Sequence, residues 1–352
     1  MKSLIDIPKT MKALVLHEVG KLTLDEVPVE EIRPGTVLVQ IKACGICSSD
    51  VERVFINGTY HFPTIPGHEF SGKIVAVGDD VDEALLGRRT CVFPMLPCFK
   101  CPSCQEQQYA QCSNYDYFGS RRDGGYAEYL VVPTWNLVLF DDDLSYDVAA
   151  MCEPAAVGIH ANSLANVKKG QSVLVIGTGM IGYVCAAFAS QITDQVIMCG
   201  NSASKLEMAK QYGWKTIALE SDNFEEKINE YTGGEGVDVV MEVVGTNQAI
   251  CNAVTAAGPN STIVLVGNPK ADLSMEKNLY WKILRKSITL RGSWNSSYSD
   301  EQNDWKAALE GLKSGKFDQL ITHRFSMEEA EEAFRVMRDR NTFSTKVMFV
   351  ME

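Results

Sequence analysis

Six short runs of β-forming residues alternate with helical segments between residues 157 and 292. Strands joined by helical crossovers form a parallel sheet with helices on both faces. This part of the chain therefore predicts an α/β fold with a doubly wound, parallel, six-stranded sheet. The six runs read SVLVIG, QVIMC, KTIAL, VDVVMEVV, STIVLVG and SITLRG.

A glycine motif, GTGMIG, follows the first of these runs and gives Gly177, Gly179 and Gly182 the spacing G-x-G-x-x-G. The first glycine permits a tight turn, the second lets the backbone approach a pyrophosphate, and the third lets helix and strand pack closely. A glycine-rich turn without a ligand is the alternative, but the position after the first of six strands favours a dinucleotide. We expect Met180 and Ile181, at the start of the following helix, to share in this site.

The second run, QVIMC, is followed by Gly200, Asn201 and Ser202, with Lys205 further along. Enzymes that bind NAD carry an acidic residue here, which binds the ribose hydroxyls and repels a 2′-phosphate. Because no carboxylate stands at this place, we expect NADP to be accepted and modestly preferred over NAD, with Asn201, Ser202 and Lys205 as contacts. The alternative is that GNSAS is a helix N-cap run, with Asn201 or Ser202 as the cap.

Four cysteines, Cys98, Cys101, Cys104 and Cys112, lie within the stretch CFKCPSCQEQQYAQC. Four thiolates that converge on one point suit tetrahedral zinc, and a fully thiolate site leaves no position open for substrate. We therefore predict a structural zinc that stabilises the lobe 98–112. Four unrelated free thiols and a C-x-x-C redox pair are the alternatives, and no thioredoxin-like pattern surrounds the cysteines.

The first part of the chain, 11–134, has short β-type runs broken by Gly and Pro, which predicts an antiparallel β-rich domain. After residue 294 come two helix-like stretches, 304–313 and 327–338, and the strand KVMFV, which we expect to return to the first domain. The expected domains are 1–156, 157–293 and the return segment 294–352.

Composition narrows the class of function. The 352 residues carry a net charge of −12 and no basic run, which argues against nucleic acid or an anionic membrane as partner. No secretory or transit signal is visible at the N-terminus, and the apolar stretch 172–190 is interrupted by the glycine motif, so a buried segment is favoured over a transmembrane one. A cytoplasmic enzyme with a small-molecule substrate is expected.

A second set of candidate metal ligands is spread over three motifs, CGICSSD, GHEFSG and MCEPAAVGIHA. Together with the four-cysteine lobe and the glycine motif, in this order and spacing, they resemble the zinc-dependent medium-chain dehydrogenases, in particular the polyol branch. The resemblance covers essentially the whole chain. It implies that the β-rich domain is a GroES-like catalytic domain.

The resemblance also implies roles for single residues. Cys47, rather than Cys44, and His68 would bind a catalytic zinc, with Glu69 and Glu153 completing the site directly or through water. Asp50 would orient the histidine, and Ser49 would take the proton of the substrate. Glu52 stands where some relatives carry a relay histidine. Cys152, next to Glu153, leaves a thiol as an alternative at that place.

The implied reaction is hydride transfer between a secondary hydroxyl of a polyol or polyol phosphate and NAD(P), with two zinc ions per chain. Arg121 and Arg122 are candidates for binding a substrate phosphate, the alternative being that they are solvated or paired with Asp116 and Asp123. A sorbitol- or xylitol-type dehydrogenase, and a non-catalytic cofactor-binding redox sensor, are the alternative functions. By family analogy, a homodimer or homotetramer is expected.

Overall fold

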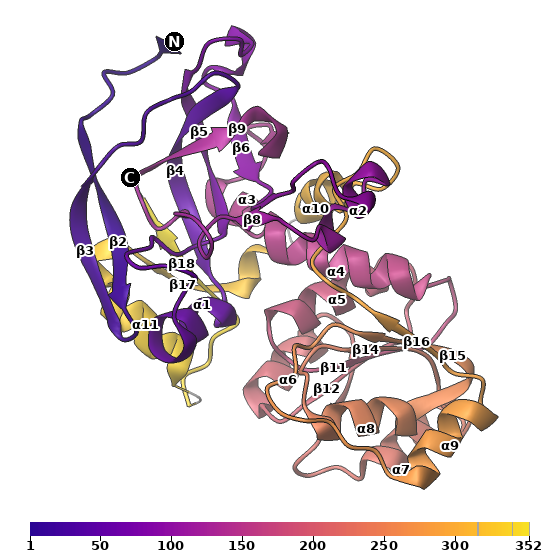
Figure 1. Ribbon diagram of the computed structural model, residues 1–352. Helices are drawn as coiled ribbons and strands as arrows, with labels where there is room; N and C mark the ends of the chain where they lie inside the picture. The colour runs from indigo at the N-terminus through magenta and orange to yellow at the C-terminus, as the bar shows by residue number, and fades with distance from the viewer. Residues whose placement is uncertain (315–316, 340, 352) are drawn as a thin grey trace. The chain divides into compact units, whose positions relative to one another are not determined.

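The computed structural model describes residues 1–314, 317–339 and 341–351. The chain forms two compact units (Figure 1). Unit 1 comprises Met1–Glu153 and Ser297–Glu352, and unit 2 comprises Pro154–Ser296. The chain thus passes between units three residues before the boundary expected at 156/157 and three residues after that expected at 293/294.

Unit 2 contains the predicted doubly wound sheet. Its strand order is β13-β12-β11-β14-β15-β16, and all neighbouring pairs are parallel. The order reverses at β11, and ligands of such sheets bind beyond the carboxyl ends of the strands at this point. The strands are β11 (Val173–Ile176), β12 (Val196–Gly200), β13 (Lys215–Ala218), β14 (Val237–Glu242), β15 (Ala257–Leu265) and β16 (Thr289–Gly292).

Helices connect these strands and cover the sheet (Figure 1). The four residues of β11 are fully buried, as expected for a central strand with helices on both faces. Branched side chains such as Leu174, Ile197 and Ile263 form the core of this unit. The helices are α5 (Met180–Ser190), α6 (Ala203–Gln211), α7 (Phe224–Thr232), α8 (Asn247–Ala256) and α9 (Lys277–Arg285), preceded by α4 (Cys152–Ala165), which begins in unit 1.

Unit 1 is built on an eight-stranded sheet with the central order β10-β6-β5-β4-β18-β17, to which β1 and β9 add by pairing with β5 and β4. The pairs are antiparallel as expected, except that β17 and β18 run parallel. The strands are β1 (Lys2–Ser3), β4 (Thr36–Ile46), β5 (Glu69–Val77), β6 (Arg89–Val92), β9 (Tyr129–Pro133), β10 (Leu137–Phe140), β17 (Ile321–Phe325) and β18 (Lys346–Val350).

The remaining elements of unit 1 lie outside this sheet. Two two-stranded sheets pair β2 (Thr10–Glu18) with β3 (Lys21–Pro28) and β7 (Met95–Leu96) with β8 (Asp116–Tyr117). The helices are α1 (Ser48–Glu52), the π-helix η1 (Arg53–Asn57), α2 (Pro102–Gln105), α3 (Tyr146–Ala150), α10 (Asp304–Leu312) and α11 (Ala330–Arg338); short 3-10 turns are η2 (Glu83–Leu85), η3 (Tyr109–Gln111), η4 (Thr134–Asn136), η5 (Asp318–Leu320) and η6 (Met327–Glu329).

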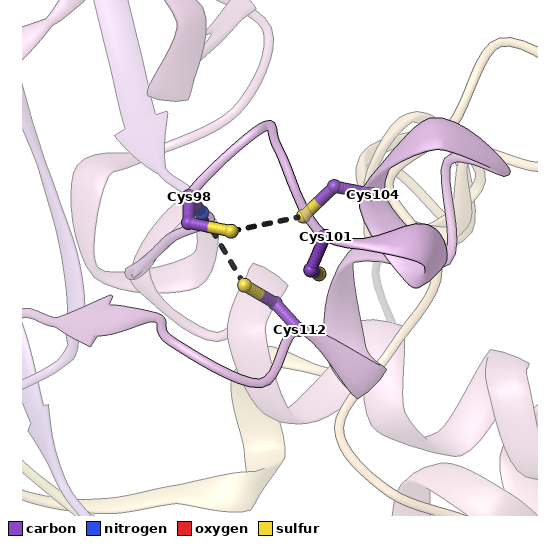
Figure 2. Close-up of side chains that lie close together, drawn as sticks. All are labelled: Cys98, Cys101, Cys104 and Cys112. Carbon is purple, nitrogen blue, oxygen red and sulfur yellow. Dashed lines mark hydrogen bonds between the residues drawn. The ribbon is translucent and has the colours of Figure 1, made fainter.

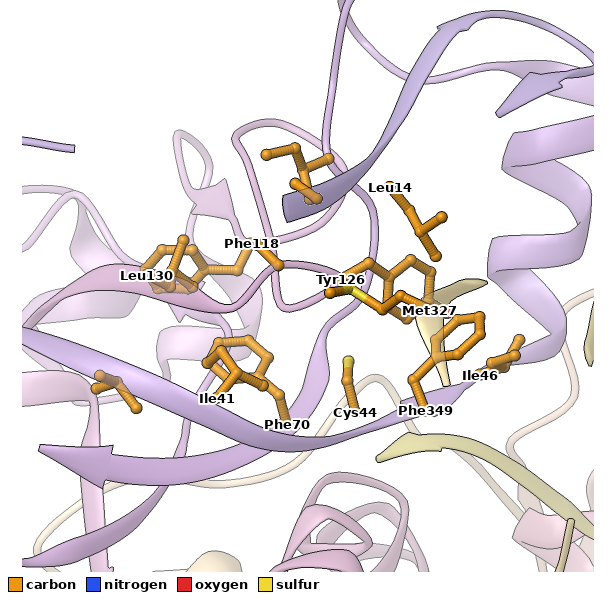
Figure 3. Close-up of a cluster of buried hydrophobic side chains, with 14 of the residues drawn as sticks. Leu14, Ile41, Cys44, Ile46, Phe70, Phe118, Tyr126, Leu130, Met327 and Phe349 are labelled. Atoms are coloured by element: carbon orange, nitrogen blue, oxygen red, sulfur yellow. The ribbon is translucent and has the colours of Figure 1, made fainter. Parts of the chain in front are cut away.

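The core of unit 1 joins both ends of the chain. Buried side chains from the first half, including Ile41, Phe70 and Tyr126, pack with Met327 and Phe349 from the C-terminal segment (Figure 3). Strand β18 pairs with β4, with Val347 opposite Ile46. The C-terminal segment therefore completes the sheet that carries the candidate site. No helix in the described ranges is long and apolar enough to cross a membrane.

Candidate metal centres and cofactor site

The four cysteines of the lobe 98–112 lie together on the loop between β7 and β8 (Figure 2). Their sulfur atoms all lie within 4.8 Å of one another. Cys98 Sγ is 4.0 Å from Cys104 Sγ, and the backbone amide of Cys98 donates to Cys112 Sγ at 3.3 Å. This arrangement offers four sulfur ligands around one point, as tetrahedral zinc requires.

Backbone amides favour the thiolate form of two of these cysteines. The amides of Ser113 and Cys104 lower the pKa of Cys101 to about 6, and those of Lys100 and Cys101 lower the pKa of Cys98. Burial acts in the opposite direction on Cys104 and raises its pKa to about 12. The lobe thus holds two thiols with a lowered pKa, Cys98 and Cys101, beside two buried ones, Cys104 and Cys112. Four thiolates at one point need a compensating positive charge, which a bound metal ion would supply.

A second cluster is formed by Cys47, His68 and Glu69, whose ligand atoms also lie within 4.8 Å of one another. The pairing of β4 with β5 brings them together, because Gly45 lies opposite Glu69 in the ladder. Cys47 follows β4 directly as the N-cap residue of α1, and His68 immediately precedes β5. Cys47 and His68, twenty-one positions apart in sequence, are therefore neighbours at one end of this strand pair.

Asp50 contacts two members of this cluster, Cys47 and His68. The carboxylate is fully buried, and its Oδ1 lies 3.4 Å from Nδ1 of His68. Its Oδ2 accepts hydrogen bonds from the amide of Cys47 at 3.1 Å and the hydroxyl of Tyr126 at 2.9 Å. Burial would raise the pKa of Asp50, but the neighbouring His68 and Arg53 hold it well below its usual range. With Nδ1 facing Asp50, His68 has Nε2 left for a metal ion.

Glu69 is engaged by Lys346, a residue that sequence reasoning missed. The two side chains form an ion pair in which each is 2% exposed, and Lys346 Nζ also donates to the carbonyl of Ile46 at 3.3 Å. The clue in the sequence was a lysine at the head of the apolar strand KVMFV, since lysine is almost never fully buried unless it is paired. Cys44 is buried and does not belong to the cluster.

Glu153 lies in the first turn of α4 and is also buried. Burial, reinforced by Glu69, raises its pKa to about 7, although His68 acts to lower it. It accepts a hydrogen bond from the hydroxyl of Tyr117 at 3.4 Å, but it does not join the group of ligand atoms within 4.8 Å. Its neighbour Cys152 is directed elsewhere, with Sγ 3.4 Å from the carbonyl of Trp305.

Ser49 lies on α1, one residue before Asp50, and is partly buried. Its Oγ accepts a hydrogen bond from Nη1 of Arg53 at 3.0 Å. The hydroxyl proton of Ser49 is therefore directed away from the guanidinium, which has no lone pair to receive it.

Arg121 and Arg122 have different surroundings. The guanidinium of Arg121 is sandwiched between two tyrosine rings, 4.2 Å from the centroid of Tyr60 and 4.4 Å from that of Tyr115. Nη2 of Arg121 also donates to the Tyr60 hydroxyl at 3.2 Å, and within the described residues no carboxylate pairs with it. Arg122 lies 3.7 Å from Asp116, which is the pairing considered as the alternative.

The loop of Arg121 adjoins the second cluster. The ring of Tyr115 is 6.3 Å from that of Tyr117, which in turn is 5.9 Å from the ring of His68. A Cβ atom on Gly124 would lie 2.1 Å from the carbonyl oxygen of Gly67, so this loop packs on the backbone just before His68. Asp123, the other carboxylate considered, instead accepts from the amide of Ile65 at 2.8 Å.

The glycine motif of unit 2 forms the turn from β11 to α5. Gly177 has φ +122°, and a Cβ on Gly182 would lie 2.0 Å from the carbonyl oxygen of Gly177, so neither position admits a side chain. Gly179 is the N-cap residue, with no atom near its missing Cβ. Met180 and Ile181 form the first turn of the helix. An open helix N-terminus of this kind suits a pyrophosphate.

At the end of β12, Gly200 packs against the side chain of Thr178, a second residue that sequence reasoning missed. Ser202 caps α6, and its Oγ accepts a hydrogen bond from the amide of Lys205 at 3.4 Å. Of the two residues considered as the N-cap, Ser202 is thus the one that has this role. Asn201 is exposed. Burial lowers the pKa of Lys205, whose charge would be relieved by a neighbouring anion.

Comparisons with known proteins also divide the chain near residue 150. Residues 33–142 match the family model of the alcohol dehydrogenase GroES-like domain, and residues 157–314 match that of the zinc-binding dehydrogenases. Galactitol 1-phosphate 5-dehydrogenase of Escherichia coli is 35% identical over 349 residues, covering 97% of this chain and 100% of the relative. Sorbitol dehydrogenase of Bacillus subtilis is 30% identical, covering 95% and 96%.

Solved structures agree with these relatives. The crystal structure of galactitol-1-phosphate dehydrogenase from Escherichia coli has a TM-score of 0.91 at 35% identity, covering 97% of this chain and 100% of that chain. A zinc-binding dehydrogenase from Sinorhizobium meliloti, bound to NADP, has a TM-score of 0.89 at 27% identity, covering 98% and 100%. The fold prediction is confirmed, and the chain belongs to the family of zinc-dependent medium-chain alcohol and polyol dehydrogenases.

Proposed function

We propose that this protein oxidises a secondary hydroxyl of a polyol phosphate of the galactitol 1-phosphate type, with NADP or NAD as hydride acceptor. The phosphate group in this proposal is supported by Arg121, whose guanidinium lies between two tyrosine rings on a loop that adjoins the second ligand cluster. An arginine without a carboxylate partner keeps its charge and its planar fork for a phosphate group. Arg122, which faces Asp116, is the weaker candidate.

The two ligand sets fit two zinc ions with different roles. The donor set Cys98, Cys101, Cys104 and Cys112 consists of thiols alone, as in closed structural sites. The mixed set Cys47, His68 and Glu69 supplies three donors, which would leave a fourth coordination position for substrate, with Glu153 close by. When bound there, zinc supplies a Lewis acid for the alcohol oxygen, and the nicotinamide supplies the hydride acceptor.

The chain's own groups would serve this reaction in three ways. Asp50 faces Nδ1 of His68 at 3.4 Å and would orient the ring, and Lys346 forms an ion pair with Glu69. The hydroxyl of Ser49 would relay the proton that leaves the substrate alcohol. Tyr117, which donates to Glu153, would keep this buried carboxyl oriented beside the cluster.

The test compares kcat/KM for galactitol 1-phosphate and galactitol in the wild-type protein and in the variants Arg121→Met and Arg122→Met. We expect the phosphate ester to be favoured, and Arg121→Met to lose about 10- to 100-fold on the ester with little change on galactitol, because a charge-assisted hydrogen bond is lost. Arg122→Met is the matched control. If the wild-type enzyme favours free polyols, a sorbitol- or xylitol-type enzyme replaces this assignment.

Cofactor choice is part of the same proposal. None of the three residues at and just after the end of β12, Gly200, Asn201 and Ser202, is a carboxylate that would repel a 2′-phosphate. The half-buried Lys205 lies at the start of α6. We expect a modest preference for NADP in kcat/KM, which Lys205→Met removes. Lys210→Met on the same helix, where Lys210 pairs with Glu207, serves as control. A tenfold or larger preference of the wild-type enzyme for NAD would contradict the proposal.

A further inference from the structure

Arg53 belongs to none of the motifs that the family resemblance identifies, yet its side chain adjoins the second ligand cluster. It begins the π-helix η1, directly after α1. Its Nη1 donates to Ser49 Oγ at 3.0 Å and to Asp50 Oδ1 at 2.8 Å. The side chain is 22% exposed. One nitrogen of Arg53 therefore contacts both the proposed proton relay and the carboxylate that orients His68.

The guanidinium of Arg53 has further donors to offer. Arginine carries five N–H groups in a planar fork, and the two contacts described use those of Nη1. Within the described residues, neither Nε nor Nη2 has a hydrogen bond, and neither is among the fully buried atoms that lack a partner. These donors consequently face accessible space.

The guanidinium of Arg53 is linked to the ligand cluster through Asp50. Asp50, which Arg53 contacts, also accepts from the amide of Cys47 at 3.1 Å, and its Oδ1 lies 3.4 Å from Nδ1 of His68. Cys47 is a member of the cluster, and the ring of Tyr117 lies 5.9 Å from that of His68. A substrate whose reacting oxygen meets Ser49 therefore has Arg53 as its next neighbour.

The charge balance around Arg53 determines which substrate group its free N–H donors can bind. Asp50 already compensates the charge of Arg53, so the remaining N–H groups do not require an anion and can pair with a neutral hydroxyl. Arg121 differs, since no described carboxylate compensates it. Nη1 contacts Ser49 Oγ at 3.0 Å, so a hydroxyl close to the reacting one is better placed for the remaining donors of Arg53 than a phosphate at the far end of a polyol.

We propose that Arg53 binds the hydroxyl on the carbon next to the reacting carbon, which makes it a specificity residue for vicinal diols. This assignment rests on the proposed function, in that it takes Ser49 as the residue nearest the reacting oxygen. It does not depend on a phosphate in the substrate.

The experiment compares hexane-1,2-diol with hexan-2-ol, which differ by the neighbouring hydroxyl alone. The ratio of kcat/KM for the pair is measured with the zinc-loaded wild-type protein and with Arg53→Met, Arg53→Lys and Arg338→Met. Arg338, which stacks on Phe55 of η1 at 4.3 Å, is the matched control. Dissociation constants of both compounds are measured by calorimetry on the same proteins, so that a failure of the proposed reaction is distinguished from a failure of this assignment.

We expect the wild-type protein and Arg338→Met to favour the diol at least tenfold in kcat/KM or in binding. In Arg53→Met the ratio should fall close to one, and Arg53→Lys should restore part of it. A ratio that stays the same when Arg53 is replaced, or a change confined to the KM of the cofactor, would overturn the assignment. If Arg53→Met does not fold, as judged by circular dichroism, the ratio in Arg53→Lys decides.

Discussion

Gly45 is closely packed against the buried ion pair of Glu69 and Lys346 at the candidate catalytic centre. A Cβ atom there would lie 2.2 Å from Oε2 of Glu69 and 2.5 Å from Cε of Lys346, so the buried ion pair would have to move. We expect Gly45→Ala to reduce the free energy of unfolding by about 1–3 kcal/mol, as overpacking does, and to lower the zinc content of the second cluster. Urea unfolding and elemental analysis measure both effects.

Gly292→Ala is the control for this prediction, because Gly292 ends an edge strand and has no atom within 4 Å of its missing Cβ. It should change stability by less than about 0.5 kcal/mol. Unchanged zinc content and stability in Gly45→Ala would mean that Glu69 and Lys346 are not held as tightly as their burial indicates.

At this scale, sequence could predict residues whose chemistry is tied to a short motif. Cys47 and His68 stand in such motifs, and the structure brings them together as expected. Lys346 could not be assigned a partner, because nearly 280 residues separate it from Glu69 and the pairing depends on β18 lying against β4. Arg53 was missed for a different reason: its partners are close in sequence, but a surface arginine on a short helix gives the same pattern.

The four-cysteine lobe is an element with little apolar core of its own, so its stability should depend on its metal. We expect Cys101→Ser to yield poorly folded protein and to lose one of two zinc ions per chain, because a structural zinc contributes directly to folding. Cys251→Ser is the control, since Cys251 lies on α8 in unit 2 and forms only long sulfur contacts in the described part of the chain. Elemental analysis that finds one zinc or none in active wild-type protein would contradict the two-zinc prediction.

The attachment of the C-terminal segment can be tested through Asp147 of α3, which pairs with Arg324 of β17 at 2.7 Å. Burial would raise the pKa of Asp147, but hydrogen bonds from Ser145, Arg324 and the amide of Val148 lower it. A lowered pKa means that the pair stabilises the fold above the unfolded value of about 3.9, and that this contribution disappears as the pH falls through the folded value.

We therefore expect Asp147→Asn to cost about 1 kcal/mol in the free energy of unfolding at pH 7 and progressively less below pH 4. Urea unfolding of the wild-type protein and the variant at pH 7 and below pH 4 measures this difference in the free energy of unfolding. Asp318→Asn is the control, because Asp318 contacts the same arginine at 2.8 Å but is 62% exposed. A cost for Asp147→Asn that stays constant with pH would show that lost packing, and not charge, is responsible.

At the scale of elements, periodicity was most informative where strands are buried on both faces. All six strands of the parallel sheet were predicted, although only inner ones, such as β11 and β12, are continuous apolar runs, while the edge strand β16 is exposed. In unit 1, β17 was missed because its sequence, ITHRF, carries polar and charged residues on a partly exposed strand. The parallel pairing of β17 with β18 could not be predicted either, because nothing local in the sequence specifies the neighbour of a strand.

For the molecule as a whole, both candidate metal centres lie in unit 1, while the glycine motif lies in unit 2 with a separate core. A ligand that binds a folded unit raises its unfolding temperature by mass action. Zinc removal and cofactor addition should therefore act on different units.

Differential scanning calorimetry would test this division. We expect two transitions in the zinc-loaded protein. A chelator should lower the temperature of one by several degrees, and NADP should raise that of the other. The matched variants are Cys101→Ser, which should reproduce the chelator effect, and Gly182→Ala, whose Cβ would clash with the carbonyl oxygen of Gly177 and should abolish the NADP effect. A single transition that shifts with both treatments would show that the two cores unfold cooperatively, so that the metal centres stabilise the cofactor-binding unit as well.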